Sequence, residues 1–447
     1  MKAKSLLMTE GNIREKMVRF AIPIFLGDLF QQLYNVVDAL VVGNVLGKDA
    51  LAAVTSTGSL VFLLVGFFGG MFSGVGVVIS KFFGAGEKEK VKTAVGTAVA
   101  FGLMAGVILT IIGVFFTPTI LRWMGTPNEV FHDAATYVRT YFTGILFVIM
   151  YNTANGIYRA IGDSKHPLYY LMVSSVVNVI LDFVFVAGLG MGVEGAAIAT
   201  VISQAVSVCL AFYRLSKVQD VYRVEWKQIR LNKAMMQQML RVGIPAGVQN
   251  SVIALANLVV QANINSFGSA AMAGSGAYAK IEGFAFIPIT SFSMSLTTFI
   301  SQNIGAGKYD RVKKGATFGL LTCVILAEII GILFAIFAPQ LIALFDRDPE
   351  VISYGVARAR IDAIFFFLLA CSHAMAGVFR GAGKTLVPMF VMLLCWCVIR
   401  VTYITIATSF VHEIQVIYWA YPLTWCLSSI LFVIYYFKVD WIHALEK

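Results

Sequence analysis

The sequence predicts an all-α polytopic membrane protein, with twelve transmembrane helices in two parallel six-helix repeats. Of its 447 residues, 59% are hydrophobic and 13% are charged, and the mean hydropathy is +0.81. Soluble domains are about 25% charged, so there is too little polar surface to cover soluble cores of this size. The composition excludes a disordered chain, a nucleic-acid-binding arm and an ordinary water-soluble enzyme.

Twelve apolar runs reach the length of about 20 residues that a helix needs to cross a bilayer. In chain order the predicted spans are 20–46, 51–81, 93–118, 132–158, 167–189, 191–216, 243–267, 270–302, 314–339, 352–379, 386–410 and 415–437. We expect the second and eighth spans to end at Gly-Ala-Gly loops, and Pro288 to kink the eighth.

Basic residues gather in alternate loops. If residues 1–19 are cytoplasmic, the segments on that side hold 26 of the 34 lysines and arginines. This is the distribution that the positive-inside rule describes. We therefore expect a multi-pass protein of the inner (plasma) membrane with both termini in the cytoplasm. The net charge of +10 is explained by topology, so no nucleic-acid partner is expected.

An internal repeat orders the spans. Arg19-Phe-Ala-Ile-Pro23 recurs as Arg241-Val-Gly-Ile-Pro245, and Gly-Ala-Gly at 84–86 and Arg-x-x-Gly at 159–162 recur 221 residues later. Six spans per half give both halves the same orientation, so the repeat is parallel. The prediction is an N-terminal lobe (1–217), a cytoplasmic basic linker (218–240) and a C-terminal lobe (241–447). A duplication of this kind favours a transporter that works by alternating access, and we expect a monomer.

Acidic residues inside the first-lobe spans are Asp28, Asp38 and Asp182, and no base lies as deep. Asp28, Asn35 and Asp38 fall on one helical stripe, and Asn178 lies four residues before Asp182. Acids in a low-dielectric site must bind a cation or hold a proton. The alternative is that they only bond to neighbouring helices. Their counterparts in the repeat carry no charge, which favours a cation site in the first lobe.

Acidic residues also occur in the predicted spans of the second lobe. Glu282 could form a structural ion pair or contact substrate, and Asp362 with Arg358 at i−4 predicts a local ion pair. Glu328 is assigned to packing, and Arg400 to a buried structural cation.

The chain resembles the multidrug and toxic compound extrusion (MATE) transporters over nearly its full length. The resemblance rests on Gln32-Leu-Tyr34-Asn35-Val-Val-Asp38 followed by Val42-Gly43, and on the repeated Gly-Ala-Gly and Arg-x-x-Gly motifs. It implies an antiporter that exports small organic cations and drugs in exchange for protons or sodium ions. The implied cation-coupling residues, which could hold a sodium ion, are Asp38, Asn178, Asp182 and Thr200. The expected substrate cavity comprises Asp28, Gln32, Tyr34, Asn35, Asn257, Gln261 and Glu282.

No cofactor beyond the coupling ion is expected, and the partners are cationic small molecules and the lipid bilayer. One alternative is a lipid-linked saccharide flippase of the same superfamily, whose cavity should be rich in arginine and lysine. A membrane-embedded enzyme or channel is a further alternative. No zinc-binding His-Glu-x-x-His sequence or nucleophile elbow supports an enzyme.

Overall fold

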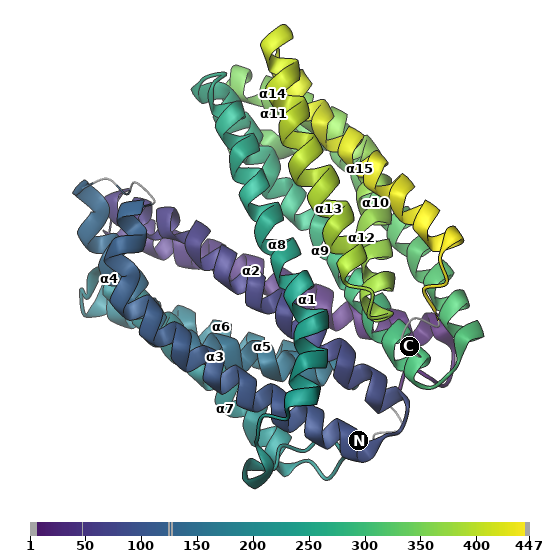
Figure 1. Cartoon of the computed structure of the whole chain (residues 1–447). Helices are drawn as coiled ribbons and strands as arrows, with labels where there is room; N and C mark the ends of the chain where they lie inside the picture. Colours follow the sequence, from purple (N-terminus) through teal and green to yellow (C-terminus); the bar gives the residue numbers. More distant parts are fainter. Residues whose placement is uncertain (1–6, 47, 124–125, 127, 443–447) are drawn as a thin grey trace. The chain divides into compact units, whose positions relative to one another are not determined.

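The computed structural model describes residues 7–46, 48–123, 126 and 128–442, with residues 38–44, 48–63 and 128–129 described by their backbone alone. The described chain is helical, without strands, and divides into two compact units. Of the described residues, unit 1 comprises Leu7 and those within 23–241, and unit 2 comprises residues 8–22 and 242–442. The all-α prediction is confirmed (Figure 1).

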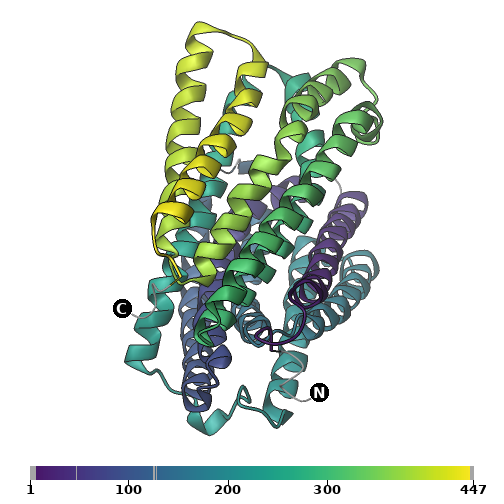
Figure 2. The same cartoon turned by 90° about the vertical axis from the view of Figure 1, so that its right-hand side faces the viewer.

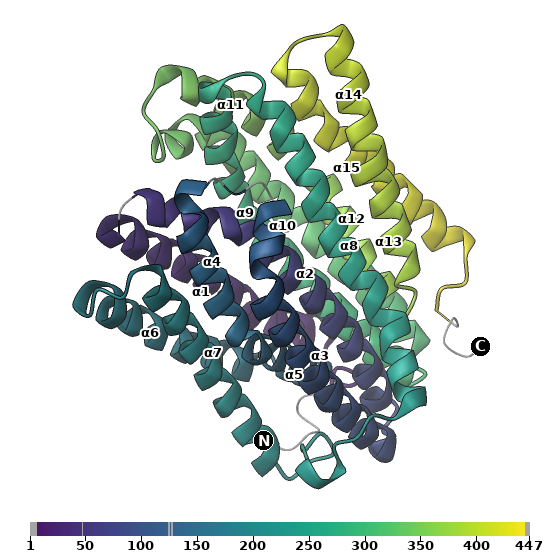
Figure 3. The same ribbon diagram turned by 60° about the vertical axis from the view of Figure 1, so that its left-hand side comes forward.

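Unit 1 contains most of α1 and the next six helices. These are α1 (Ile13–Leu46), α2 (Lys48–Gly84), α3 (Lys88–Trp123), α4 (Asn128–Thr143), α5 (Ile145–Ala160), α6 (Lys165–Asp182) and α7 (Gly192–Lys217). The π-helix η2 (Phe183–Gly188) extends α6, and a short 3-10 turn, η3 (Trp226–Gln228), lies in the linker. In the core of this unit, α3 packs on α5 and α6 packs along α7, which Figure 3 shows side by side.

Unit 2 repeats the arrangement. Its helices are α8 (Lys233–Asn265), α9 (Ser269–Gly305), α10 (Tyr309–Ala343), α11 (Pro349–Asp362), α12 (Phe366–Gly381), α13 (Leu386–Met392), α14 (Arg400–Phe410) and α15 (Ile414–Lys438). The 3-10 turn η4 (Ala363–Phe365) joins α11 to α12, and the π-helix η5 (Leu393–Ile399) joins α13 to α14. Helix α9 lies at the centre, in contact with α10, α11 and α12. Figure 2 shows the green-to-yellow helices of this unit running alongside one another.

Eleven described helices or helix pairs are long and apolar enough to cross a membrane. The span predicted at 132–158 corresponds to two shorter helices, because the structure divides it into α4 and α5 at Gly144. A side chain at Gly144 would place its Cβ 2.4 Å from the Val201 side chain of α7. Because Gly144 has no side chain, the backbone at this position can lie close to α7. A hydropathy pattern cannot predict such a contact.

The first helix of each unit begins in the other unit. Residues 13–22 of α1 belong to unit 2, and residues 233–241 of α8 belong to unit 1. Both changes of unit fall at the repeated Arg-x-x-Ile-Pro motif, just before Pro23 and within three residues of Pro245. The sequence boundaries had assigned residues 8–22 to the N-terminal lobe.

Hydrogen bonds hold the start of α1 to unit 2. The Arg311 guanidinium donates to the carbonyl oxygens of Met8, Glu10 and Gly11 at 2.7–3.2 Å. The Lys308 ammonium donates to the Thr9 carbonyl at 2.9 Å. These bonds fix the backbone of residues 8–11 against the turn between α9 and α10.

Candidate functional site

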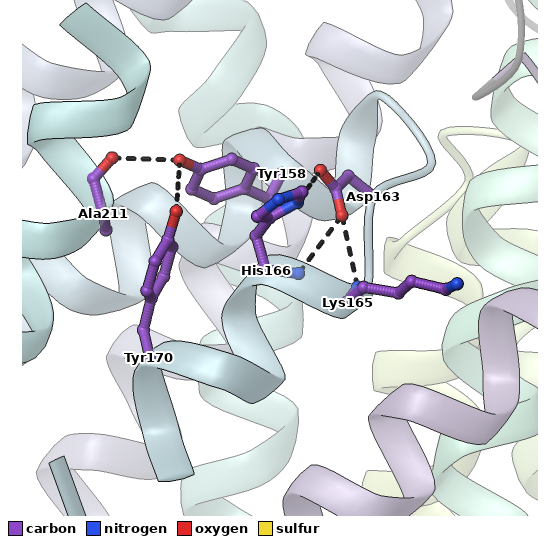
Figure 4. Close-up of polar contacts among 6 residues, drawn as sticks. All are labelled: Tyr158, Asp163, Lys165, His166, Tyr170 and Ala211. Atoms are coloured by element: carbon purple, nitrogen blue, oxygen red, sulfur yellow. Dashed lines mark hydrogen bonds and ion pairs between the residues drawn. The ribbon is translucent and has the colours of Figure 1, made fainter. Parts of the chain in front are cut away.

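Helices α5, α6 and α7 of unit 1 are joined by a buried tyrosine pair. The Tyr158 hydroxyl on α5 donates to the Ala211 carbonyl on α7 at 3.0 Å and lies 3.3 Å from the Tyr170 hydroxyl on α6 (Figure 4). Farther along, the Ser174 hydroxyl donates to the Ser203 carbonyl at 2.8 Å. These bonds set α6 and α7 in register and position the polar residues that follow on each helix.

The turn before α6 is organised by Asp163. Its carboxylate accepts from the backbone N–H groups of Lys165 and His166 at 3.2 and 3.3 Å, and contacts His166 Nδ1 at 2.5 Å (Figure 4). Backbone N–H groups at a helix start lack partners within the helix, and a carboxylate accepts from them well. Gly162, with φ of +86°, occupies the left-handed region that ends α5.

Asn178, Asp182 and Thr200 form one buried polar cluster between α6 and α7. Asp182 is fully buried, and Asn178 and Thr200 are 1% and 8% exposed. The Thr200 hydroxyl donates to the Ala196 carbonyl at 3.1 Å, so its oxygen lone pairs point elsewhere. The structure thus brings together three of the four residues predicted for cation coupling. The fourth, Asp38, lies on α1 among residues whose side chains fall outside the description.

The Asn178 amide fits this cluster in two orientations. In one, its Nδ2 donates to Thr200 Oγ1 at 3.4 Å. In the other, Nδ2 donates to Asp182 Oδ2 at 2.8 Å and Oδ1 accepts from the Thr200 N–H at 3.2 Å. Without a cation the second orientation is favoured, because it makes two good bonds. The first turns the amide oxygen toward the carboxylate, so that three oxygens could face one cation.

The backbone changes form directly after Asp182. Helix α6 ends there and continues as the π-helix η2. Single π-helical turns are rare and occur frequently at functional sites. In unit 2 the π-helix η5 directly precedes Arg400. Each unit therefore has a π-helical segment beside a buried charged residue, with an acid in unit 1 and a base in unit 2.

Helix α1 presents the other first-lobe candidates. Asp28, Gln32 and Tyr34 are partly buried, whereas Asn35 is exposed and accepts from the Gln31 amide at 3.2 Å. Asp28 interacts electrostatically with Arg159, near the end of α5. The sequence had assigned Arg159 to a loop and described the deep first lobe as free of bases. The structure thus gives Asp28 an electrostatic partner, which lies at the end of α5.

Second-lobe candidates lie on α8 and α9. Asn257 is exposed on α8, and Gln261 is partly buried there, donating to the Asn265 side chain at 2.8 Å. Glu282 on α9 lies 3.6 Å from the Arg358 guanidinium. Of the two alternatives that the sequence left open for Glu282, the structure thus contains the ion pair.

Arg358 on α11 is the centre of a buried charge cluster in unit 2. Its Nε lies 3.2 Å from Asp362 Oδ2, as the i,i+4 spacing predicts, and it also pairs with Glu282. The guanidinium lies over the rings of Tyr421 and Tyr278, 4.9 and 5.1 Å from their centroids. Sequence reasoning missed the contact with Glu282, because it joins residues 76 apart in the chain.

Arg400 is a second buried base in unit 2. Its guanidinium donates twice to the Thr424 hydroxyl, at 3.0 and 2.7 Å, and lies over the rings of Trp396 and Tyr421. The expectation of a buried arginine is confirmed. Glu328, assigned to packing, accepts from the Phe367 N–H at 3.1 Å at the start of α12. Within the described part of the chain, no three His, Cys, Asp or Glu side chains are grouped to hold a metal ion.

Comparison with known proteins identifies the architecture. The MatE family model matches residues 23–184 and 245–406, one match in each unit. The chain is 30% identical over 436 residues to the probable multidrug resistance protein YoeA of Bacillus subtilis, covering 96% of this chain and 94% of YoeA. It is 26% identical over 410 residues to the probable multidrug resistance protein YpnP of the same organism, covering 91% of each.

The fold matches that of solved transporters. A crystal structure of a MATE transporter in the bent conformation aligns with a TM-score of 0.91 at 22% identity, covering all of this chain and 98% of that one. That fold has twelve transmembrane helices, which agrees with the twelve predicted once α4 and α5 are taken together. The protein is therefore a multi-pass membrane transporter of small molecules rather than an enzyme. With a family model matched in both halves and a relative matched over nearly its whole length, the chain belongs to the MatE family of multidrug efflux transporters.

Proposed function

We propose that the protein is an antiporter that exports organic cations in exchange for protons or sodium ions. The observation that supports this most directly is the buried cluster of Asn178, Asp182 and Thr200. An ionised carboxylate is costly inside a membrane unless a proton or a cation accompanies it. Binding of that ion can therefore change the relative energies of two conformations of the carrier, which is what coupling requires.

The three side chains offer the right ligand atoms for either ion. Carboxylate, amide and hydroxyl oxygens suit a hard cation such as sodium, and the Asp182 carboxylate alone suits a proton. Asp38 is proposed as the fourth member on the basis of the family resemblance. The Asn178 amide would turn its oxygen to sodium and its nitrogen to an ion-free carboxylate. The orientation of this side chain thus distinguishes the sodium-bound site from the ion-free one.

Substrate charge follows from the acids of the first lobe. Asp28 and Asp38 on α1 make this lobe more attractive to cations than to anions, although Arg159 offsets part of the charge of Asp28. The remaining cavity candidates, Gln32, Tyr34, Asn35, Asn257 and Gln261, supply neutral hydrogen-bonding groups. Such a lining would recognise a class of organic cations rather than one molecule.

Orientation is proposed from the basic loops. With the basic segments in the cytoplasm, both termini face inward and export runs outward across the plasma membrane. A cysteine introduced at Ser216 or Lys308 should be protected from impermeant reagents in intact cells, whereas one at Lys48 should react. Reaction at the first two positions and protection at the third would invert the topology.

The decisive experiment is exchange in proteoliposomes, with sodium and pH gradients imposed separately. Asp182→Asn keeps the side-chain shape but removes the group that titrates or binds sodium, so gradient-driven efflux of a cationic dye should be abolished at normal expression. Glu328→Gln is the matched control, because a glutamine carbonyl can still accept the Phe367 N–H bond. Normal efflux by Asp182→Asn would overturn the proposed site. Transport of lipid-linked sugars without dye transport would favour the flippase.

A further inference from the structure

A groove of about 660 Å³ lies within unit 2, between the start of α1 and the first turns of α10. Ile13 and Arg14 form one wall, and Lys313, Lys314, Phe318 and Leu321 form the other. Both walls belong to the same compact unit, because residues 8–22 pack with unit 2. None of the residues proposed for coupling is among those that line the groove.

The mouth of the groove is basic. Arg14, Lys313 and Lys314 are exposed, and no acid is among the residues that line it. Neither lysine forms an ion pair with any of the residues described, and the Arg14 guanidinium lies over the Phe318 ring at 5.9 Å. A mouth with three bases and no acid attracts a group with concentrated negative charge.

The internal repeat provides a comparison. Lys92, 221 residues before Lys313, forms an ion pair with Glu89 at 3.0 Å. The counterpart of Glu89 is Asp310, and within the described chain it makes no ion pair with Lys313. The Lys92 ammonium in unit 1 is therefore paired with a carboxylate, whereas the Lys313 ammonium in unit 2 can pair with an anionic ligand.

The groove continues into an apolar face of α10. Exposed side chains follow Leu321 at intervals of three or four residues, which places them on one side of the helix. They are Ile325, Ile329, Ile332 and Ile336. Of the eleven candidate spans, α10 has the highest mean hydropathy, 2.7, and the smallest buried share, 17%. This face is suited to contact with hydrocarbon chains.

The hydrogen bonds from Arg311 and Lys308 to residues 8–11 hold the α1 wall in place. Arg14 follows directly, in the first turn of α1, where its N–H bonds to the Asn12 side chain at 2.9 Å. The groove therefore exists before any ligand arrives, which lowers the entropy lost on binding.

We propose that this groove binds one anionic phospholipid. Its phosphate lies between Arg14, Lys313 and Lys314, and an acyl chain follows Leu321 and the isoleucines of α10. Basic clusters at the cytoplasmic ends of membrane helices attract anionic headgroups. The apolar continuation favours a lipid over a free phosphate, which would leave that face uncovered. The inference goes beyond the transport cycle, and the leaflet is cytoplasmic if the proposed orientation holds.

The test measures binding alone, on the purified full chain in neutral detergent. Native mass spectrometry would titrate phosphatidylglycerol, phosphatidylcholine with the same acyl chains, and glycerol phosphate. We expect saturation of one phosphatidylglycerol site and no saturation with the other two. Equal binding of both lipids would overturn headgroup recognition, and equal binding of glycerol phosphate would replace the lipid with a free phosphate.

Two variants locate the site. Lys313→Gln with Lys314→Gln should weaken phosphatidylglycerol binding roughly tenfold to thirtyfold, which follows from two lost headgroup contacts. Lys227→Gln with Lys233→Gln removes the same charge from exposed positions elsewhere and should leave binding unchanged. Equal losses in both would indicate diffuse attraction and refute the site.

A further variant, Thr317→Trp, fills the groove while keeping all three bases and should also displace the lipid. Unchanged binding in this variant would contradict occupation of the groove. These experiments measure lipid binding and not transport. A negative result would therefore refute the lipid site without bearing on the antiport proposal.

Discussion

Replacing Arg358 with glutamine should destabilise the protein more than any other single change in its buried charge cluster. Arg358 and Asp362 are 3% and 0% exposed, and Arg358 pairs with both Asp362 and Glu282. Arg358→Gln leaves two buried carboxylates without this cation. Removing one partner of a buried ion pair costs about 3–5 kcal/mol. For a unit of this size we expect the melting temperature to fall by on the order of 10 °C.

The partner variants separate charge from packing. Asp362→Asn should lower the stability less than Arg358→Gln does. In that variant Arg358 retains its ion pair with Glu282 and its contact with the Tyr421 ring. Arg358→Gln combined with Asp362→Asn should be more stable than Arg358→Gln alone, because the double variant no longer buries the Asp362 charge without its partner, and Glu282 still interacts with Arg400. Arg360→Gln, at an exposed position on the same helix, is the control.

The assay is thermal melting of the purified chain in one detergent, followed by loss of the monodisperse peak on gel filtration. The reasoning is refuted if Arg358→Gln melts within about 2 °C of the parent protein, or if the double variant is no more stable than the single one.

Two further predictions concern packing and helix capping, each measured by the same melting assay. Gly315→Ala should lower the free energy of unfolding by about 1–3 kcal/mol, because the added Cβ would lie 2.0 Å from the buried Phe299 ring. Gly276→Ala is the control and should be neutral, because nothing lies within 4 Å of its added Cβ. Equal effects of the two substitutions would contradict the packing argument. Asp163→Ala should cost about 1 kcal/mol by removing the acceptor for two helix-start N–H groups. Asp163→Asn keeps an acceptor and should cost less, so equal losses would show that capping is not the cause.

Much of the fold follows from the sequence because its causes are local or repeated. Apolar length predicts the spans, and the motifs at Pro23 and Pro245 predict two equivalent halves. Helical spacing also predicts the pair Arg358–Asp362 and the common face of Asn178 and Asp182, since residues four apart are neighbours on a helix.

The remaining features depend on contacts between distant residues. Glu282 and Arg358 lie on different helices, and no spacing rule relates them. The break at Gly144 depends on the approach of Val201. The electrostatic interaction of Asp28 with Arg159 joins residues 131 apart in the chain. Thr200 is predicted from the family resemblance alone. Its contact with Asn178 is known only from the structure. Asp38 stays a prediction.

The start of α1 also has a consequence for how the chain is made. The Met17 carbonyl accepts from the Ser295 hydroxyl, 278 residues later in the chain. Chains are synthesised at typical rates of about 5–20 residues per second. Ser295 is therefore synthesised roughly 15–60 s after Met17, and the contact between them cannot form earlier. The nascent N-terminal half must therefore enter the bilayer with one end of its first helix undocked. The same holds if the two halves are expressed from separate genes, since cutting at the linker leaves residues 8–22 on the half that does not hold their binding surface.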